Sequence, residues 1–202
     1  MTDVPSSAAA AIIAAGRRMD ALGFVPATAG NISVRLDEDS IAITASGGHK
    51  GFLTAAQVMI VDLEGQPRSP GKPSAETLLH CQIYRRFADV GAVLHGHSVP
   101  GTVLSMATPG DEIRLAQYEL LKVFQDQTTH ETDLALPLVD NDQDIARLAR
   151  AMEPRLAQTR LGYLIRGHGV YVWAPRMDMA LARLEGLEFL LACELEQRKL
   201  AR

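Results

Sequence analysis

The chain has 202 residues, of which 47% are hydrophobic and 22% are charged, and its formal net charge is −4. This length suits one domain, residues 1–202, around one substantial core, and the composition is that of an ordinary globular protein. Nucleic-acid-binding proteins usually have an excess of basic residues, whereas this chain has a negative net charge. We therefore expect no nucleic-acid partner.

The N-terminal third predicts one helix followed by short strands and loops. Ser6 or Ser7 caps a helix that runs to about Leu22 and stops at Gly23. The alanine-rich start of this helix has no basic residues before it, and Arg17 interrupts its apolar run. The pattern therefore indicates neither a signal peptide nor a membrane span. After it the patterns predict strands at 32–36 and 41–44 joined as a hairpin, a glycine-rich loop at 46–51, a short helix at 54–57, a strand at 58–63 and a surface loop at 65–73.

The rest of the chain alternates helices and strands. Ser74 is expected to cap a helix at 75–86, and Asn141 or Asp142 to cap a helix that ends near Leu156. The other predicted elements are a strand at 91–97, a helix at 100–106, a strand that turns into a helix within 115–124, strands at 134–139, 162–165 and 170–173, and a long helix at 177–200. Strands outnumber simple crossover units, which predicts a three-layer α/β/α fold with a mixed, largely antiparallel central sheet.

The two cysteines, Cys81 and Cys193, lie inside helical patterns and lack the spacing of a disulfide framework. We interpret them as buried small apolar residues. This usage favours a reducing compartment, so we expect a cytoplasmic protein without membrane association.

Three histidines are candidate metal ligands. His95 and His97 alternate along the predicted strand at 91–97, so their imidazoles lie on one face and can reach one divalent cation. His168 lies between two glycines and supplies a third ligand from a tight turn, which leaves one coordination position open. The alternative is that the three histidines are ordinary polar residues that bind no metal. Each buried imidazole would then need its own hydrogen-bond partners. Imidazole favours zinc, but iron, manganese or cobalt accept the same ligands.

Two carboxylates are candidates for an acid/base role. Glu119 lies between apolar residues, where partial desolvation would raise its pKa, although a lone Glu in an amphipathic segment is more often solvated. Glu76 lies in the first turn of the predicted helix at 75–86, where the helix dipole favours a carboxylate, and plain capping is its alternative. His80, one helical turn after Glu76, is interpreted as a structural histidine.

A candidate anion site combines Asn31 with the loop at 46–51. Glycine amides, a hydroxyl and a lysine in one loop suit a phosphate group. The residues concerned are Asn31, Ser46, Gly47 and Lys50. Because a Ser-Gly-Gly turn is usually only a turn, composition alone makes this a weak signal.

Five segments, in this order, resemble the class II aldolase and adducin family, and together they span nearly the whole chain. They are TAGNIS at 28–33, SGGHKG at 46–51, KPSAET at 72–77, AVLHGHS at 92–98 and RGHGVY at 166–171. Finer matches at 117–122, 141–145 and 184–190 resemble one branch of that family, the bacterial methylthioribulose-1-phosphate dehydratases of methionine salvage. The pair Gly48-His49 departs from the family pattern, where a less glycine-rich pair is expected.

The resemblance implies one zinc ion bound by His95, His97 and His168. It implies an acid/base role for Glu119, with Glu76, the position that transfers a proton in the aldolases of the family, as second candidate or as a neighbour of the zinc. It also implies phosphate binding by the candidate anion site. The implied reaction converts 5-methylthioribulose 1-phosphate to 2,3-diketo-5-methylthiopentyl 1-phosphate with loss of water. Related domains place active sites between subunits, so we expect a homo-oligomer, a tetramer.

Two rival functions belong to other classes. A class II sugar-phosphate aldolase or epimerase would use the same metal-assisted chemistry, and the histidines do not exclude it, although the segment around Glu119 favours dehydration. A non-enzymatic adducin-like module does not need an open metal site. The presence of all three histidines therefore argues against this alternative.

Overall fold

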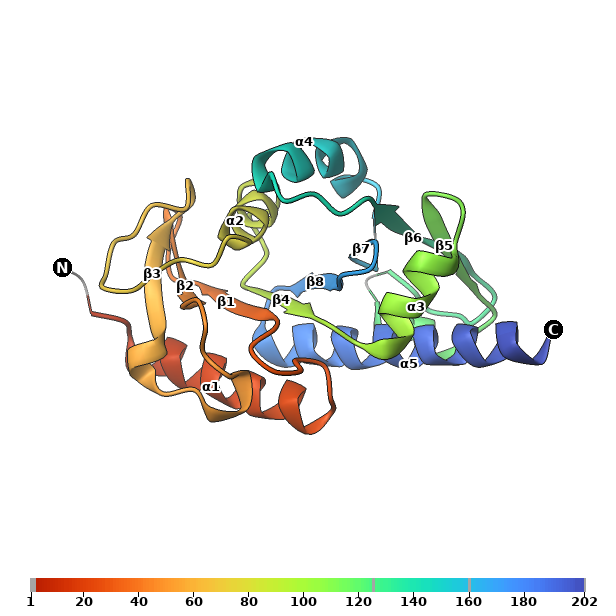
Figure 1. The fold of residues 1–202 in the computed structure, drawn as a ribbon, viewed down its shortest axis with the longest axis horizontal. Helices are drawn as coiled ribbons and strands as arrows, with labels where there is room; N and C mark the ends of the chain where they lie inside the picture. The colour runs from red at the N-terminus through yellow and green to blue at the C-terminus, as the bar shows by residue number, and fades with distance from the viewer. Residues whose placement is uncertain (1–2, 125, 160, 202) are drawn as a thin grey trace.

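The computed structural model describes residues 3–124, 126–159 and 161–201, and its elements are arranged around a sheet of eight strands (Figure 1). From one edge to the other the strands are β3 (Val58–Asp62), β2 (Ser40–Thr44), β1 (Asn31–Arg35), β4 (Ala92–Gly96), β8 (Val170–Ala174), β7 (Tyr163–Ile165), β6 (Asp133–Val139) and β5 (Glu112–Ala116). Neighbouring strands are antiparallel except β6 and β7, which run parallel. The predicted mixed, largely antiparallel sheet is confirmed.

Helices cover both faces of this sheet. They are α1 (Ser6–Ala21), α2 (Thr77–Arg86), α3 (Val99–Ala107), α4 (Ile145–Leu156) and α5 (Met177–Leu200), with short 3-10 segments η1 (Lys50–Phe52), η2 (Ala55–Gln57) and η3 (Glu119–Val123). Figure 1 shows α2 and α4 on one side of the sheet and α1 and α5 on the other, and α3 packs against α5. These are the three layers that the sequence predicts.

Alternate residues of the central strands supply two separate cores. In β4, Leu94 packs into the core formed with α1 and α5, whereas Val93 packs into the core formed with α2 and α4. Ala42 and Ile43 of β2 divide in the same way. Because successive side chains of a strand point to opposite faces, the central strands are apolar on both sides and bury both faces beneath helices.

Helix α2 begins later than the sequence predicts. Its first helical residue is Thr77, and the residue at the N-cap position is Glu76 rather than Ser74. The side chain of Glu76 forms no capping hydrogen bond. The carboxylate therefore lies just outside the helix instead of inside its first turn, and it is available for other contacts.

Helix α4 also begins later, because a different residue caps it. The side chain of Asp144 accepts a hydrogen bond from the backbone N–H of Arg147 at 3.0 Å. The expected caps, Asn141 and Asp142, both lie before the helix. Three neighbouring residues can all serve as caps at similar free energy, so local sequence does not choose among them.

Among the residues that the structure describes, none of the helices combines the length and the apolar character that crossing a bilayer requires. Cys81 and Cys193 are both free thiols. Cys81 is buried, as expected, whereas Cys193 is only partly buried.

Candidate active site

The register of the sheet brings three parts of the chain to one end. Asn31 lies opposite His95 in the antiparallel pair β1 and β4, and Gly96 lies opposite Val170 in the antiparallel pair β4 and β8. The beginning of β1, the end of β4 and the beginning of β8 therefore meet. His168 lies in the turn that precedes β8, so it reaches the same place.

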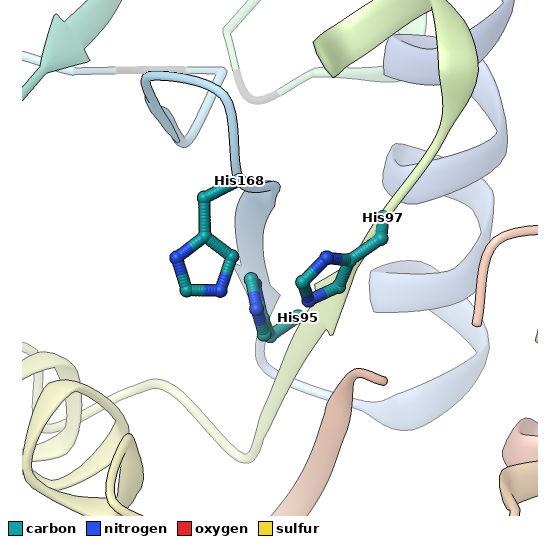
Figure 2. Close-up of side chains that lie close together, drawn as sticks. All are labelled: His95, His97 and His168. Atoms are coloured by element: carbon teal, nitrogen blue, oxygen red, sulfur yellow. The ribbon is translucent and has the colours of Figure 1, made fainter. Parts of the chain in front are cut away.

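The three candidate ligands converge at this end of the sheet (Figure 2). One ring nitrogen from each of His95, His97 and His168 lies within 4.8 Å of the other two. The ring centroids are 4.6 Å apart for His95 and His97, 5.1 Å for His95 and His168, and 4.8 Å for His97 and His168. His95 is buried, and the other two are partly exposed. A ligand can thus approach the cluster from solvent.

The ring of His95 is held with one nitrogen free. Nδ1 lies 2.9 Å from the carbonyl oxygen of Val170, so Nδ1–H donates there and Nε2 keeps its lone pair. The ring stacks on Tyr171, its partner across β4 and β8, at a centroid distance of 4.2 Å. Nε2 is buried and has no hydrogen-bond partner among the described residues. A buried lone pair beside two further imidazoles fits a cation such as Zn²⁺.

The glycines on either side of His168 are required by the turn. Gly167 has a φ of 63°, which residues with a Cβ rarely adopt. A Cβ on Gly169 would lie 2.2 Å from the carbonyl oxygen of Gly96 and 2.9 Å from Cε1 of His95. Both glycines therefore let the turn come close enough for His168 to face the other imidazoles.

Glu76 is the carboxylate beside the histidines. Its Oε1 lies 2.8 Å from Nε2 of His168, and its Oε2 lies 3.5 Å from Nε2 of His95. The side-chain amide of Asn31 donates to Oε2 at 2.5 Å, which fixes the carboxylate. Burial acts to raise the pKa of Glu76, but the hydrogen bond from His168 and the neighbouring imidazoles outweigh burial and lower the pKa to about 2.

Two of the imidazoles are neutral at neutral pH. Burial lowers the pKa of His95 well below its ordinary value. Burial, together with the neighbouring His168, lowers the pKa of His97 to about 4. A neutral imidazole presents the lone pair that a metal ion needs, so both residues are in their ligating form.

The residues of the candidate anion site line a pocket that also contains Glu76 and His97. The volume of this pocket is about 320 Å³. Its lining includes Asn31, Ser46, Gly47 and Lys50. The same cavity therefore joins one candidate metal ligand and one carboxylate to the glycine-rich loop.

Lys50 also holds this pocket together. The side chain is almost fully buried, and Nζ donates to the carbonyl oxygens of Thr28 and Gly48, each at 2.8 Å. Burial lowers the pKa of Lys50, while the charge of Glu76 acts to raise it. An ammonium group has three donors, so one N–H is left for a ligand.

Glu119 lies apart from the histidines within one chain. Its side chain is 72% exposed, and it forms ion pairs with Lys122 at 2.6 Å and with His130 at 3.8 Å. In the described ranges no hydrogen bond or ion pair joins it to the three histidines or to Glu76. The hydrogen bond from Lys122 lowers the pKa of Glu119. The expected raised pKa is thus wrong for the single chain, because neighbours in sequence do not bury the carboxylate.

His80 lies in the core and outside the cluster of candidate ligands, and only one of its two ring nitrogens has a hydrogen-bond partner among the described residues. It is fully buried, and its Nδ1 lies 2.7 Å from Oγ of Ser33, which also contacts the hydroxyl of Tyr84 at 3.0 Å. Burial lowers the pKa of His80 to about 4. This histidine is not part of the cluster formed by the three candidate ligands.

Sequence reasoning missed two groups that orient the candidate ligands. One is the carbonyl group of Val170, which accepts from His95. The other is Asn141, whose Oδ1 lies 3.4 Å from Nδ1 of His168. No side-chain pattern reveals a backbone acceptor. For Asn141 the one signal is its position in the matched segment 141–145, which the sequence assigns to helix capping instead.

Residues 10–195 match the family described as Class II Aldolase and Adducin N-terminal domain. The chain is 63% identical over 202 residues to a methylthioribulose-1-phosphate dehydratase of Gluconacetobacter diazotrophicus, covering 100% of this chain and 98% of that protein. It is 51% identical over 194 residues to a methylthioribulose-1-phosphate dehydratase of Pseudomonas aeruginosa, covering 95% of each.

Solved structures share the fold. An L-fuculose 1-phosphate aldolase superposes with a TM-score of 0.83 at 19% identity, covering 99% of this chain and 90% of that chain. An L-fuculose-1-phosphate aldolase of Thermus thermophilus gives a TM-score of 0.77 at 25% identity, covering 95% of both. The likeness confirms the fold class that the sequence predicts.

Proposed function

The chain belongs to the class II aldolase and adducin family, and on this premise we propose that it is a hydro-lyase of methionine salvage. It converts 5-methylthioribulose 1-phosphate to 2,3-diketo-5-methylthiopentyl 1-phosphate with loss of water. The observation that carries the proposal is the cluster of three imidazoles, with the buried Nε2 of His95 lacking a hydrogen-bond partner, beside Glu76 and a pocket of about 320 Å³. Similarity to dehydratases over the full chain supports this choice of reaction. The free thiols are consistent with a cytoplasmic enzyme.

His95, His97 and His168 would hold one Zn²⁺ per subunit, because imidazole suits zinc and no cysteine belongs to the described cluster. When bound there, such a cation polarises the C2 carbonyl of a ketose and makes the C3 proton more acidic.

The phosphate group of the substrate would occupy the pocket beside the histidines. The hydroxyl of Ser46, the backbone amide of Gly47 and the remaining N–H of Lys50 would donate to it. Asn31 donates one N–H to Glu76, and its amide has a second N–H for the substrate. Binding the phosphate here would place the first carbons of the sugar at the imidazoles.

Dehydration requires two proton movements. The proton on C3 is removed, and the C4 hydroxyl departs with a proton as water, which leaves an enol. Protonation of that enol at C4 gives the 2,3-diketone. A single carboxyl group can serve both steps, because it takes the C3 proton and can return it to the leaving oxygen.

We assign this acid/base role to Glu119, with Glu76 as a neighbour of the cation and as second candidate. Glu119 is exposed in one chain, so it would act on the site of an adjacent subunit. Gln117, two residues earlier, has a φ of 64°, a conformation that is rare without glycine and often found near functional sites. Exposed Leu120 and Phe189 give the neighbouring surface the apolar character of an interface.

The protein is therefore expected to sediment as a homo-tetramer at working concentration. Each subunit supplies the histidines of its own site and Glu119 to the next, so a monomer would lack a complete site. Analytical ultracentrifugation measures the mass directly. A monomeric species that retains full dehydratase activity would contradict both the assembly and the shared site.

Mixed oligomers test the shared site more sharply. His97→Ala chains lack a metal ligand, and Glu119→Gln chains lack the acid/base, so each oligomer alone should be inactive. If Glu119 acts across the interface, oligomers assembled from both chains regain activity at sites that combine an intact histidine cluster with an intact Glu119. If Glu119 acts within its own chain, mixing restores nothing.

The reaction itself is tested with two substrates. Zinc-loaded protein is expected to form the diketone from 5-methylthioribulose 1-phosphate and to leave a simple ketose phosphate, such as L-fuculose 1-phosphate, uncleaved. Ultraviolet absorbance and mass spectrometry follow the diketone, and a coupled assay follows cleavage products. Cleavage of the ketose phosphate without diketone formation would favour the aldolase alternative, in which Glu76 beside the imidazoles is the proton carrier.

A further inference from the structure

The parallel strand pair of the sheet places Asn141 beside His168. Val139 of β6 lies opposite Ile165 of β7, so the chain leaves both strands at the same end. Asn141 follows Val139 by two residues, and His168 follows Ile165 by three. An antiparallel pair would have sent the two segments in opposite directions.

Arg166 anchors the two segments to each other. Its backbone N–H donates to the carbonyl oxygen of Val139 at 2.9 Å, and its Nε donates to Oδ1 of Asp140 at 2.8 Å. The same guanidinium donates to the carbonyl oxygens of Ser105 and Thr108, each at 2.6 Å. The segment before Asn141 and the turn before His168 therefore belong to one tethered unit.

The two ring nitrogens of His168 face different groups. Nε2 faces the cluster and lies 2.8 Å from Oε1 of Glu76. Nδ1 faces away and lies 3.4 Å from Oδ1 of Asn141. His95 shows the same division, with Nδ1 bound to a carbonyl oxygen and Nε2 toward the cluster. Because Asp144 caps α4, the side chain of Asn141 has no capping role.

We propose that Asn141 is a positioning residue that accepts the Nδ1 proton of His168 when a cation takes the place of the Nε2 proton, and that it holds the ring so that Nε2 is aimed at the cation site. An acceptor on the outer nitrogen fixes the tautomer and the ring orientation, and it makes the ligating nitrogen more basic. The affinity of the cluster for a divalent metal therefore depends on a residue that does not touch the metal. This inference rests on the proposed metal site but not on the proposed substrate.

The test measures zinc affinity without substrate, by competition with a chromophoric chelator at fixed pH. Asn141→Leu keeps the size of the side chain but removes the acceptor, so it should bind zinc about 10- to 100-fold more weakly than the unmodified chain. Asn141→Asp keeps an acceptor oxygen and should bind zinc at least as tightly as the unmodified chain. Unchanged affinity in the leucine variant overturns the proposal, and so does an equal loss in both variants.

Two controls separate positioning from a general structural effect. Asp142→Ala removes the adjacent side chain, which pairs with Arg147, and should leave zinc affinity unchanged. In the zinc-loaded chains the Nδ1–H proton of His168 should exchange slowly with water in the unmodified chain and the aspartate variant, and faster in the leucine variant, which lacks the acceptor. If zinc binding behaves in this way but no diketone forms, the proposed function fails and this inference stands.

Discussion

A His97→Ala chain is expected to be purified without stoichiometric metal and without dehydratase activity. His97 supplies one of three imidazoles, and the loss of one of three protein ligands should weaken zinc binding enough for the metal to be lost during purification. Polarisation by a bound cation accounts for several kcal/mol of barrier, so dehydration should fall by at least about 10³-fold. Elemental analysis measures the metal, and a diketone assay measures the reaction.

The choice of residue and control makes this result informative. His97 is partly exposed, whereas His95 is buried and stacked on Tyr171, so the alanine substitution at 97 removes little core packing. His130→Ala, at an exposed histidine outside the cluster, should retain full metal content. A His97→Ala chain that keeps one zinc per subunit would mean that the cation lies elsewhere.

Glu119→Gln is expected to keep its zinc and to lose about 10²- to 10⁴-fold in the rate of dehydration, because the amide cannot carry the proton. The carboxylate is exposed and outside the imidazole cluster, so neither folding nor metal binding should change. Metal content, thermal midpoint and turnover of the same preparation give the comparison. Near-normal turnover would transfer the proton-carrying role to Glu76.

Glu76→Gln is the matched substitution for this experiment. Because Glu76 contacts His168 and accepts from Asn31, its replacement should alter zinc affinity as well as turnover. The two variants therefore differ in their metal content, even where both lose activity. A Glu76 variant with unchanged zinc affinity and abolished turnover, beside an active Glu119 variant, would identify Glu76 as the acid/base.

Much of the fold follows from local periodicity. The alternation that sends Val93 and Leu94 to opposite cores is present in the sequence, and so is the alternation that puts His95 and His97 on one face. These patterns depend only on the geometry of a strand, in which side chains repeat every two residues. The layers, the order of elements and two candidate ligands could therefore be predicted without tertiary information.

The tertiary structure decided what depends on register and on competition between nearly equal local choices. Glu76 lies beside the imidazoles because α2 begins two residues later than the sequence predicts. Asn141 is available to contact His168 because Asp144, and not Asn141, caps α4. Adjacent caps differ by fractions of a kcal/mol, which packing readily outweighs. The contact between Asn141 and His168 depends on one parallel strand pair between distant segments. Sequence by itself determined the strand periodicity and indicated the candidate groups, whereas long-range pairing determined which of those groups meet.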